Sequence, residues 1–278
     1  LYKHQVEAIS LASAGESYVL TTGTGSGKSL SYFIPVVDAC LKAKALDPKP
    51  RTRAIVVYPM NALANSQLEE LKKFLGADPG TRAVTFGRFT GQESTEEREA
   101  MKANPPDILL TNFMMLELLL TRQNAIDQQV IANAKGLRFL ILDELHTYRG
   151  RQGADVALLV RRVREALAER LVCIGTSATM ATEGTEIERN AKVAEVASRL
   201  FGTKIPATNI ITETLKRTTP ESETDVTVQP RLAGAIEAGV PQTTSFEELA
   251  THPVAIWVEM TLGLTYESGK PRRAKPKT

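Results

Sequence analysis

Eight residues near the start of the chain have the composition of a loop that holds phosphate groups: Thr22-Gly23-Thr24-Gly25-Ser26-Gly27-Lys28-Ser29. The three glycines let successive backbone N–H groups point at one anion, and a helix beginning after the loop would add the positive end of its dipole. Lys28 has the reach to bind β- and γ-phosphates, and the Ser29 hydroxyl suits Mg²⁺. The alternative is a flexible loop before a helix, since the strict pattern places Gly where this chain has Thr22.

A second reactive group, Asp143-Glu144-Leu145-His146, directly follows the apolar run 139–142. Mg²⁺ prefers oxygen ligands and keeps several waters, so the single carboxylate of Asp143 suits it. Glu144 can then polarise a water in line with the γ-phosphate. An acidic pair after a strand is as often a solvated strand end, and it is the phosphate loop that favours the catalytic interpretation.

Short apolar runs must position these segments, and they predict strands at 18–21, 54–58, 82–86, 107–111, 139–142 and 171–175. Leucines and valines at helical spacing lie between several of them, over 63–75 and 156–167. This alternation predicts an α/β fold with a mostly parallel sheet and helices on both faces. Both reactive segments follow strands, at the edge where such sheets bind ligands.

The alternation of apolar runs and helical stretches ends after about Gly202. Residues 203–240 are rich in Thr, Pro, Glu and Gly with weak periodicity, residues 246–264 have helical spacing, and residues 270–278 are basic. We therefore expect one domain over 1–205 and a partly helical C-terminal extension over 206–278.

The composition narrows the class of protein. The chain has 278 residues with 34 Lys and Arg against 32 Asp and Glu, so its net charge of +2 excludes a polycation and any nucleic-acid contact must be local. Arg161, Arg162 and Arg164 fit either a solvated helix face or such a contact.

Two isolated cysteines, Cys40 and Cys173, exclude a zinc ribbon or disulfide framework and fit a reducing compartment. No apolar run has the ~18–20 residues of a membrane span, so we expect a cytoplasmic protein with no membrane partner.

The two reactive segments and a third one, residues 176–179, together resemble a known family. The phosphate loop, Asp143–His146 and Thr176-Ser177-Ala178-Thr179 are similar, in this order, to motifs I, II and III of superfamily-2 helicases of the DEAD/DEAH-box (DExH) branch. The longer run 143–150 resembles large bacterial DExH helicases of the repair and defence type, which carry a C-terminal cysteine cluster. The resemblance covers residues 1–205 and implies the first RecA-like domain of a P-loop NTPase.

The resemblance also implies roles for residues outside the two reactive segments. Tyr2 and Gln5 would form an adenine clamp, Ser177 and Thr179 would couple the γ-phosphate to domain movement, and His146 would relay hydrogen bonds to a second domain. Contacts to a nucleic-acid backbone would come from Pro59, Asn61, Thr90, Gly91, Thr111 and Asn112. Their small hydroxyls and backbone N–H groups suit phosphates, although helix capping by Asn61 and Thr111 is an equal alternative.

The resemblance implies an ATP- and Mg²⁺-dependent nucleic-acid helicase or translocase, with DNA favoured and RNA left open, in repair or phage defence with partners from those systems. The alternatives are a P-loop ATPase remodeller, an ATP-dependent switch without strand separation, and a domain with a degenerate ATP site. A second RecA-like domain does not fit within residues 206–278. We therefore expect the motor half of a longer protein, weakly active by itself.

Overall fold

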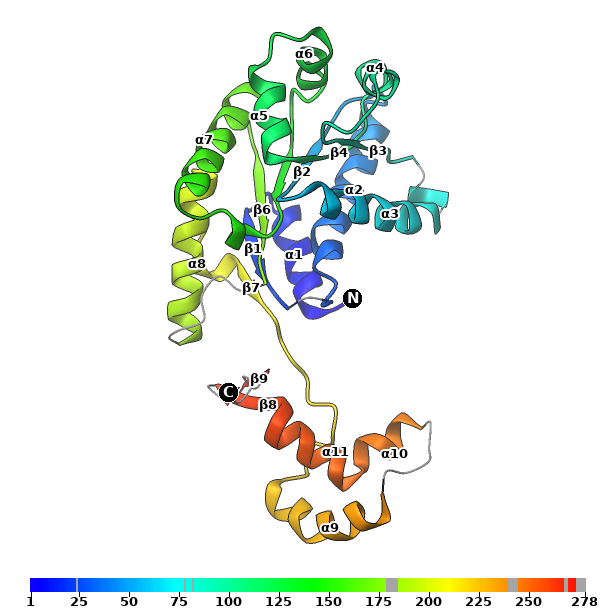
Figure 1. The fold of residues 1–278 in the computed structure, drawn as a ribbon, viewed down its shortest axis with the longest axis vertical. Helices are drawn as coiled ribbons and strands as arrows, with labels where there is room; N and C mark the ends of the chain where they lie inside the picture. Colours follow the sequence, from blue (N-terminus) through cyan, green and yellow to red (C-terminus); the bar gives the residue numbers. More distant parts are fainter. Residues whose placement is uncertain are drawn as a thin grey trace. The chain divides into compact units, whose positions relative to one another are not determined.

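Seven strands of the computed structural model form one sheet: β1 Tyr18–Thr21, β2 Ala54–Tyr58, β3 Phe86–Phe89, β4 Ile108–Asn112, β5 Phe139–Leu142, β6 Val172–Thr176 and β7 Ile210–Thr212. They pair in parallel in the order β3-β4-β2-β5-β6-β1-β7 (Figure 1). The expected α/β fold with a mostly parallel sheet is confirmed.

The structure describes residues 1–23, 25–77, 79–81, 83–178, 185–239, 245–267 and 270–273. The chain divides into two units, Leu1–Thr212 and Glu213–Thr278. The expected boundary near residue 205 lies in the segment leading into β7, which joins the sheet beside β1 and so belongs to the first unit.

Helices cover both faces of the sheet. In the first unit they are α1 Lys3–Ser13, α2 Lys28–Leu46, α3 Asn61–Ala77, α4 Thr95–Ala103, α5 Phe113–Thr121, α6 Ala125–Ala132, α7 Gly150–Leu167 and α8 Glu186–Phe201. Helices α1 to α3 bury their apolar side chains against one face, and α5 to α8 against the other (Figure 1). Successive β5 side chains pack into the hydrophobic cores on opposite faces of the sheet. Phe139 and Ile141 lie in the core beneath α1 to α3, and Leu140 and Leu142 lie in the core beneath α5 to α8.

The second unit contains α9 Asp225–Ala238, α10 Phe246–Thr251, α11 Pro253–Val258, a π-helical turn over Glu259–Gly263, and the antiparallel strands β8 Leu264–Glu267 and β9 Lys270–Arg273. The helical stretch expected over 246–264 is divided into α10, α11 and the π-helical turn. Pro253 has no backbone N–H to continue a helix, and it instead starts α11 at the first helical position. Within the described ranges, no helix is long and apolar enough to cross a bilayer.

The strand expected over 82–86 is also misplaced, because β3 begins where that prediction ends. The backbone N–H and hydroxyl of Thr85 both donate to the Asp107 carboxylate at 2.9 Å, which fixes the chain just before β3. The same buried carboxylate accepts from Lys44 at 2.5 Å and from Arg53 at 2.6 Å. Asp107 thus joins α2, β2 and β3 at the amino ends of the strands.

Close packing at Gly175 positions the loop after β5. A Cβ at Gly175, in β6, would overlap the Leu145 side chain and would lie 3.4 Å from the Phe201 ring. Leu145 is buried in the core beneath α7 and α8, so the absence of a side chain at Gly175 lets the Asp143–His146 segment lie against the sheet.

We predict that Gly175→Ala lowers the free energy of unfolding by about 1–3 kcal/mol, the usual cost of overpacking a dense core. Urea denaturation measures it. The matched control is Gly76→Ala in α3, where a Cβ would meet no described atom within 4 Å. Because alanine favours a helix, the control should gain stability by about 0.5–1 kcal/mol. Equal stability of Gly175→Ala and the parent chain would contradict this packing argument.

Candidate active site

The phosphate loop forms a tight turn between β1 and α2. Gly25 and Gly27 both have φ 77°, in the left-handed region that favours glycine, and Gly27 is the N-cap residue directly before α2. Thr22, which departs from the strict pattern, is fully buried and its hydroxyl lies 2.8 Å from that of Ser26. This hydroxyl contact closes the turn. Thr24 lies outside the described residues.

The expected adenine clamp contacts the phosphate loop directly. Gln5 is buried, and its amide nitrogen donates to the Gly27 carbonyl at 3.2 Å while its amide oxygen accepts from the backbone N–H of Tyr2 at 3.0 Å. Tyr2 is exposed, with its ring stacked on His4 at 5.7 Å between centroids. Gln5 therefore tethers α1 to the loop, and its role toward adenine stays a prediction.

Lys28 and Glu144 meet although they are far apart in the sequence. Lys28 Nζ lies 3.7 Å from Glu144 Oε1, with the two side chains 12% and 23% exposed. Lys28 Nζ and Glu144 Oε2 are buried, and neither has a hydrogen-bond partner in the part of the chain that is described. A buried ammonium without hydrogen bonds is costly, so this geometry favours an anionic ligand at Lys28.

Thr176, the first residue of the segment similar to motif III, organises the acidic pair, a role that the sequence did not predict. Its hydroxyl donates to Asp143 Oδ1 and accepts from the backbone N–H of Glu144 at 3.1 Å. Burial raises the pKa of the Asp143 carboxyl, and the Thr176 hydroxyl and Lys28 oppose that rise. A buried carboxylate of this kind is stabilised by a nearby cation. The sequence signals for Thr176 were its place in the motif III segment and its position at the end of the strand β6.

The residues after Asp143 continue the network. Glu144 has φ 53° and ψ 56°, and in the described ranges no other non-glycine residue has a positive φ. Such strain, of about 1–3 kcal/mol, clusters at functional sites. Nδ1 of His146 lies 3.2 Å from the hydroxyl of buried Ser177 and 3.2 Å from Glu144 Oε2. Motifs II and III therefore touch through His146, while Thr179 falls outside the described residues.

These donors fit a magnesium–triphosphate. Lys28 supplies a positive charge that has no hydrogen-bond partner among the described residues, and the N-terminus of α2 adds its dipole. Ser29 and Asp143 supply oxygens of the kind that Mg²⁺ binds. The ion pair of Lys28 with Glu144 brings the phosphate loop and the acidic segment together, as the sequence predicted.

The three segments expected to contact nucleic acid also converge. Asn112 Nδ2 donates to Asn61 Oδ1 at 2.6 Å and to the Thr90 carbonyl at 3.2 Å. Asn112 Oδ1 accepts from the backbone N–H of Met115 at 2.8 Å and so caps α5. Asn61 begins α3, directly after Pro59 and Met60. The residues form one polar cluster at the ends of β2 and β4.

Three of the residues expected to contact phosphate, Thr90, Gly91 and Thr111, instead donate hydrogen bonds within the chain. Thr111 is fully buried and its hydroxyl donates to the Phe89 carbonyl at 2.6 Å, so this side chain joins β4 to β3 and faces no ligand. The backbone N–H groups of Thr90 and Gly91 each donate to the Glu93 carboxylate at 2.8 Å. Those amides are occupied by an internal anion that the sequence interpretation did not consider.

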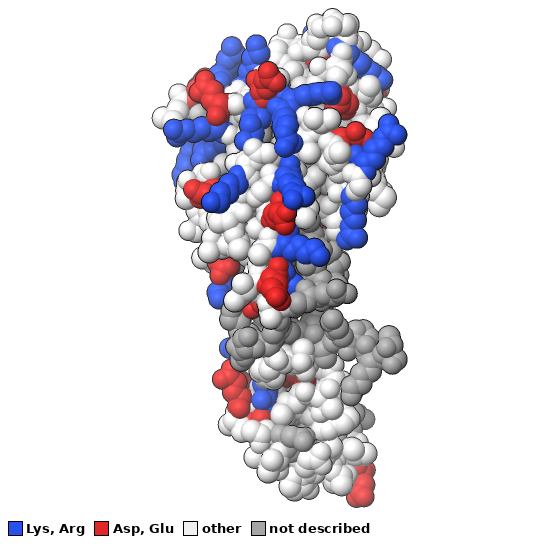
Figure 2. Space-filling model, turned by 90° about the vertical axis from the view of Figure 1, so that its left-hand side faces the viewer, with Lys and Arg blue, Asp and Glu red and all other residues white. Residues whose placement is uncertain are grey.

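The arginines of α7 serve mainly the fold. Arg164 donates to the Phe201 carbonyl at 2.7 Å, Arg162 pairs with Glu117, and Arg161 donates to the Ala157 carbonyl at 2.6 Å. Figure 2 shows Lys and Arg interspersed with Asp and Glu over the face that carries α7 and α8. This mixture is typical of a solvated helix face.

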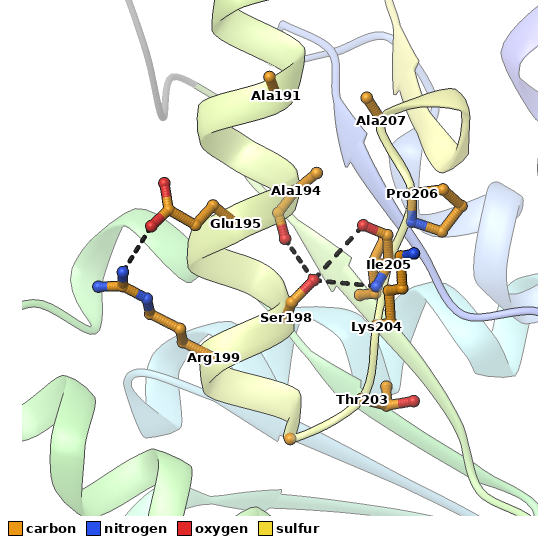
Figure 3. A pocket seen from close by; sticks show the side chains of 11 residues that line it. Ala191, Ala194, Glu195, Ser198, Arg199, Thr203, Lys204, Ile205, Pro206 and Ala207 are labelled. Atoms are coloured by element: carbon orange, nitrogen blue, oxygen red, sulfur yellow. Dashed lines mark hydrogen bonds and ion pairs between the residues drawn. The ribbon is translucent and has the colours of Figure 1, made fainter.

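An open hollow of about 730 Å³ lies elsewhere, between α8 and residues 203–207 (Figure 3). Small side chains of α8, including Ala191 and Ala194, line it. The Ser198 hydroxyl donates to the Ala194 carbonyl at 2.6 Å and accepts from the Ile205 N–H at 2.9 Å. No residue of the phosphate loop or of the Asp143–His146 segment is among the residues that line this hollow.

Residues 2–187 match the family described as DEAD/DEAH box helicase. This chain belongs to that family. The match includes the phosphate loop, the acidic segment and the cluster around Asn112, which confirms the resemblance seen in the sequence.

Similar proteins include large helicases. Druantia protein DruE of Escherichia coli (strain UMEA 4076-1) is 26% identical over 80% of this chain and 18% of its own length. The ATP-dependent helicase HRQ1 of Saccharomyces cerevisiae is 31% identical over 58% of this chain and 14% of its own. The structure of Mycobacterium smegmatis helicase Lhr bound to ssDNA and AMP-PNP has a TM-score of 0.61 and 27% identity over 84% of this chain and 30% of Lhr. The chain therefore spans less than a fifth of these two curated relatives.

We predict that Thr176→Val lowers the free energy of unfolding by about 1–3 kcal/mol, because Asp143 and the Glu144 N–H lose their shared partner while buried. Chemical denaturation measures it. The control is Thr121→Val. The exposed Thr121 hydroxyl donates only to the Glu117 carbonyl among the described groups, so its removal should change the free energy of unfolding by at most about 0.5 kcal/mol. Similar losses in both variants would disprove the bridging role.

Proposed function

We propose that this chain is the ATP-binding motor half of an ATP-dependent DNA helicase or translocase that acts in repair or phage defence. The observation that carries the proposal is the buried Lys28 ammonium, which lies 3.7 Å from Glu144 and has no hydrogen-bond partner in the described chain. A triphosphate at the loop would supply that partner.

Each residue of the site has a role in this proposal. Lys28 and the loop amides bind the phosphates, and Ser29 and Asp143 hold the metal ion. Mg²⁺, when bound, neutralises charge that develops on the phosphate oxygens. Glu144 orients and polarises the attacking water, and His146 with Ser177 carries the nucleotide state to the neighbouring elements.

Nucleic-acid binding is assigned to the cluster of Asn61 and Asn112, in which the Asn112 amide holds Asn61 at the start of α3. Side-chain amides beside a helix start suit phosphate oxygens and do not read sequence, as a translocating motor requires. The Lhr structure, which contains ssDNA, supports DNA as the substrate. We place the protein in the cytoplasm, where ATP and nucleic acid are both available.

The domain organisation is part of the same proposal. The first RecA-like domain, expected over residues 1–205, extends to Thr212 so that it includes β7, and the rest of the chain connects it to a second RecA-like domain of the same polypeptide, which closes over ATP. The test is ATP hydrolysis by a protein that includes the second domain, with and without single-stranded DNA. Turnover that neither DNA nor RNA stimulates would favour a remodeller or switch and overturn the helicase proposal.

We predict that Lys28→Ala weakens Mg-ATP binding by about 10- to 100-fold, since a hydrogen bond to a charged group contributes about 1.5–3 kcal/mol. Calorimetry on the 278-residue chain measures it. The control is Lys42→Ala on the same helix, where the exposed ammonium pairs with Asp38 at 2.7 Å, and its affinity should match the parent. Unchanged affinity in Lys28→Ala would remove the main support for the site.

We predict that Glu144→Gln retains Mg-ATP binding and slows DNA-stimulated hydrolysis by about 10²- to 10⁴-fold, the usual contribution of a general base. Steady-state turnover in the two-domain protein measures it. Glu99→Gln, which alters an exposed carboxylate paired with Lys102 at 3.1 Å, serves as the control. Parent-like turnover in Glu144→Gln would show that another group positions the water.

A further inference from the structure

Glu93 is a buried carboxylate with a full set of hydrogen-bond donors. It lies between β3 and α4, and its side chain is 3% exposed. Oε2 accepts from the backbone N–H groups of Thr90 and Gly91, both at 2.8 Å. Oε1 accepts from the Thr90 hydroxyl at 2.9 Å and from Arg88 Nε at 2.8 Å. Four donors match the four lone-pair sites of an ionised carboxylate.

This carboxylate takes the position that a phosphate oxygen would need. Two successive backbone N–H groups that converge on one point form an anion-binding concavity, and here the anion belongs to the chain itself. Burial raises the pKa of Glu93, but the donors from Thr90 and Arg88 outweigh it and leave that pKa below its usual value. Glu93 therefore stays ionised and keeps the two amides.

The same carboxylate fixes the residues assigned to nucleic acid. With its N–H and hydroxyl held by Glu93, Thr90 presents its carbonyl to Asn112 Nδ2 at 3.2 Å. Asn112 in turn donates to Asn61 at the start of α3. A second connection runs through Arg88, which donates from Nε to Glu93 and from its NH1 group to Asn65 Oδ1 at 2.6 Å, also on α3.

We propose that Glu93 is a positioning residue for nucleic-acid binding. It occupies the amide concavity of Thr90 and Gly91 and, through Thr90 and Asn112, holds Asn61 in the orientation that contacts a strand. The strand is then bound through the side-chain NH₂ group of Asn61, because both N–H groups of the Asn112 amide are donated within the cluster and Glu93 holds the loop amides. This inference rests on the proposed nucleic-acid function of the cluster.

Glu93→Gln tests it. The neutral amide has one acceptor oxygen, so its NH₂ group must face either Arg88 or the two backbone N–H groups. We expect the affinity of the 278-residue chain for a fluorescein-labelled oligothymidylate, measured by anisotropy, to fall about tenfold, the effect of losing roughly one hydrogen bond of ordinary strength. Mg-ATP affinity should stay at the parent value.

Glu97→Gln is the matched control. Its carboxylate also accepts from a backbone N–H, that of Ser94 at 2.7 Å, but it caps α4 and makes no contact with Thr90 or Asn112 among the described hydrogen bonds. It should lose thermal stability without losing strand affinity. If the loss of strand affinity in both variants is proportional to the decrease in melting temperature, Glu93 is only structural and the proposal fails.

A double-mutant cycle with Asn112→Ala adds a second readout. If Glu93 acts through Asn112, the double variant binds the strand no more weakly than Asn112→Ala alone, whereas independent effects would multiply and refute the proposal. Should Glu93→Gln not fold, Arg88→Lys, which keeps the charge and loses the planar fork, is expected to weaken strand binding in the same direction.

The outcomes separate this inference from the proposed function. A parent chain that binds neither labelled DNA nor labelled RNA contradicts the nucleic-acid function itself. If the parent binds and Glu93→Gln binds equally, the positioning role is wrong. If Glu93→Gln binds more tightly, the carboxylate competes with the strand phosphate for the amides, and the proposal is overturned.

Discussion

The site depends on one hydroxyl group, that of Thr176, which joins the carboxyl ends of two neighbouring strands. It can donate to Asp143 and accept from the Glu144 N–H only because β5 and β6 pair in parallel with Leu142 opposite Gly175. The missing side chain at Gly175 leaves room for Leu145, so the acidic segment turns back over the sheet. The left-handed backbone of Glu144 is maintained by that pairing, and it places the Glu144 carboxylate near Lys28.

Much of the sheet could be predicted from the sequence, because strands buried on both faces are continuous apolar runs. The expected bounds of β1, β2 and β5 match the structure, and those of β4 and β6 are displaced by one residue. Edge strands were harder. β7 has only three residues, and β3 has a start set by Thr85 hydrogen bonds to Asp107, a contact across the sequence that no local pattern reveals.

In the site, too, contiguous motifs could be predicted from the sequence, and hydrogen bonds between separate segments could not. The phosphate loop and the acidic pair are contiguous motifs, so residue type and order sufficed to locate them at one edge of the sheet. The partners of backbone groups could not be predicted in this way. Thr90 and Gly91 have the composition of a phosphate-binding loop, yet Glu93 takes their amides, and Thr111 is turned into the sheet. Hydrogen-bond donors have to be assigned in three dimensions before a loop is counted as available to a ligand.

The position of β7 has a mechanical consequence. This strand is the last element of the first unit, and it pairs in parallel with β1, Thr21 opposite Thr212, while the Thr21 hydroxyl donates to the Ile211 carbonyl at 3.3 Å. Tension applied along the chain at Glu213 would therefore load the β1–β7 hydrogen bonds in shear, all at once, instead of unzipping them one by one. The strand that resists such a pull is β1, which runs into the phosphate loop, so the force acts directly beside that loop.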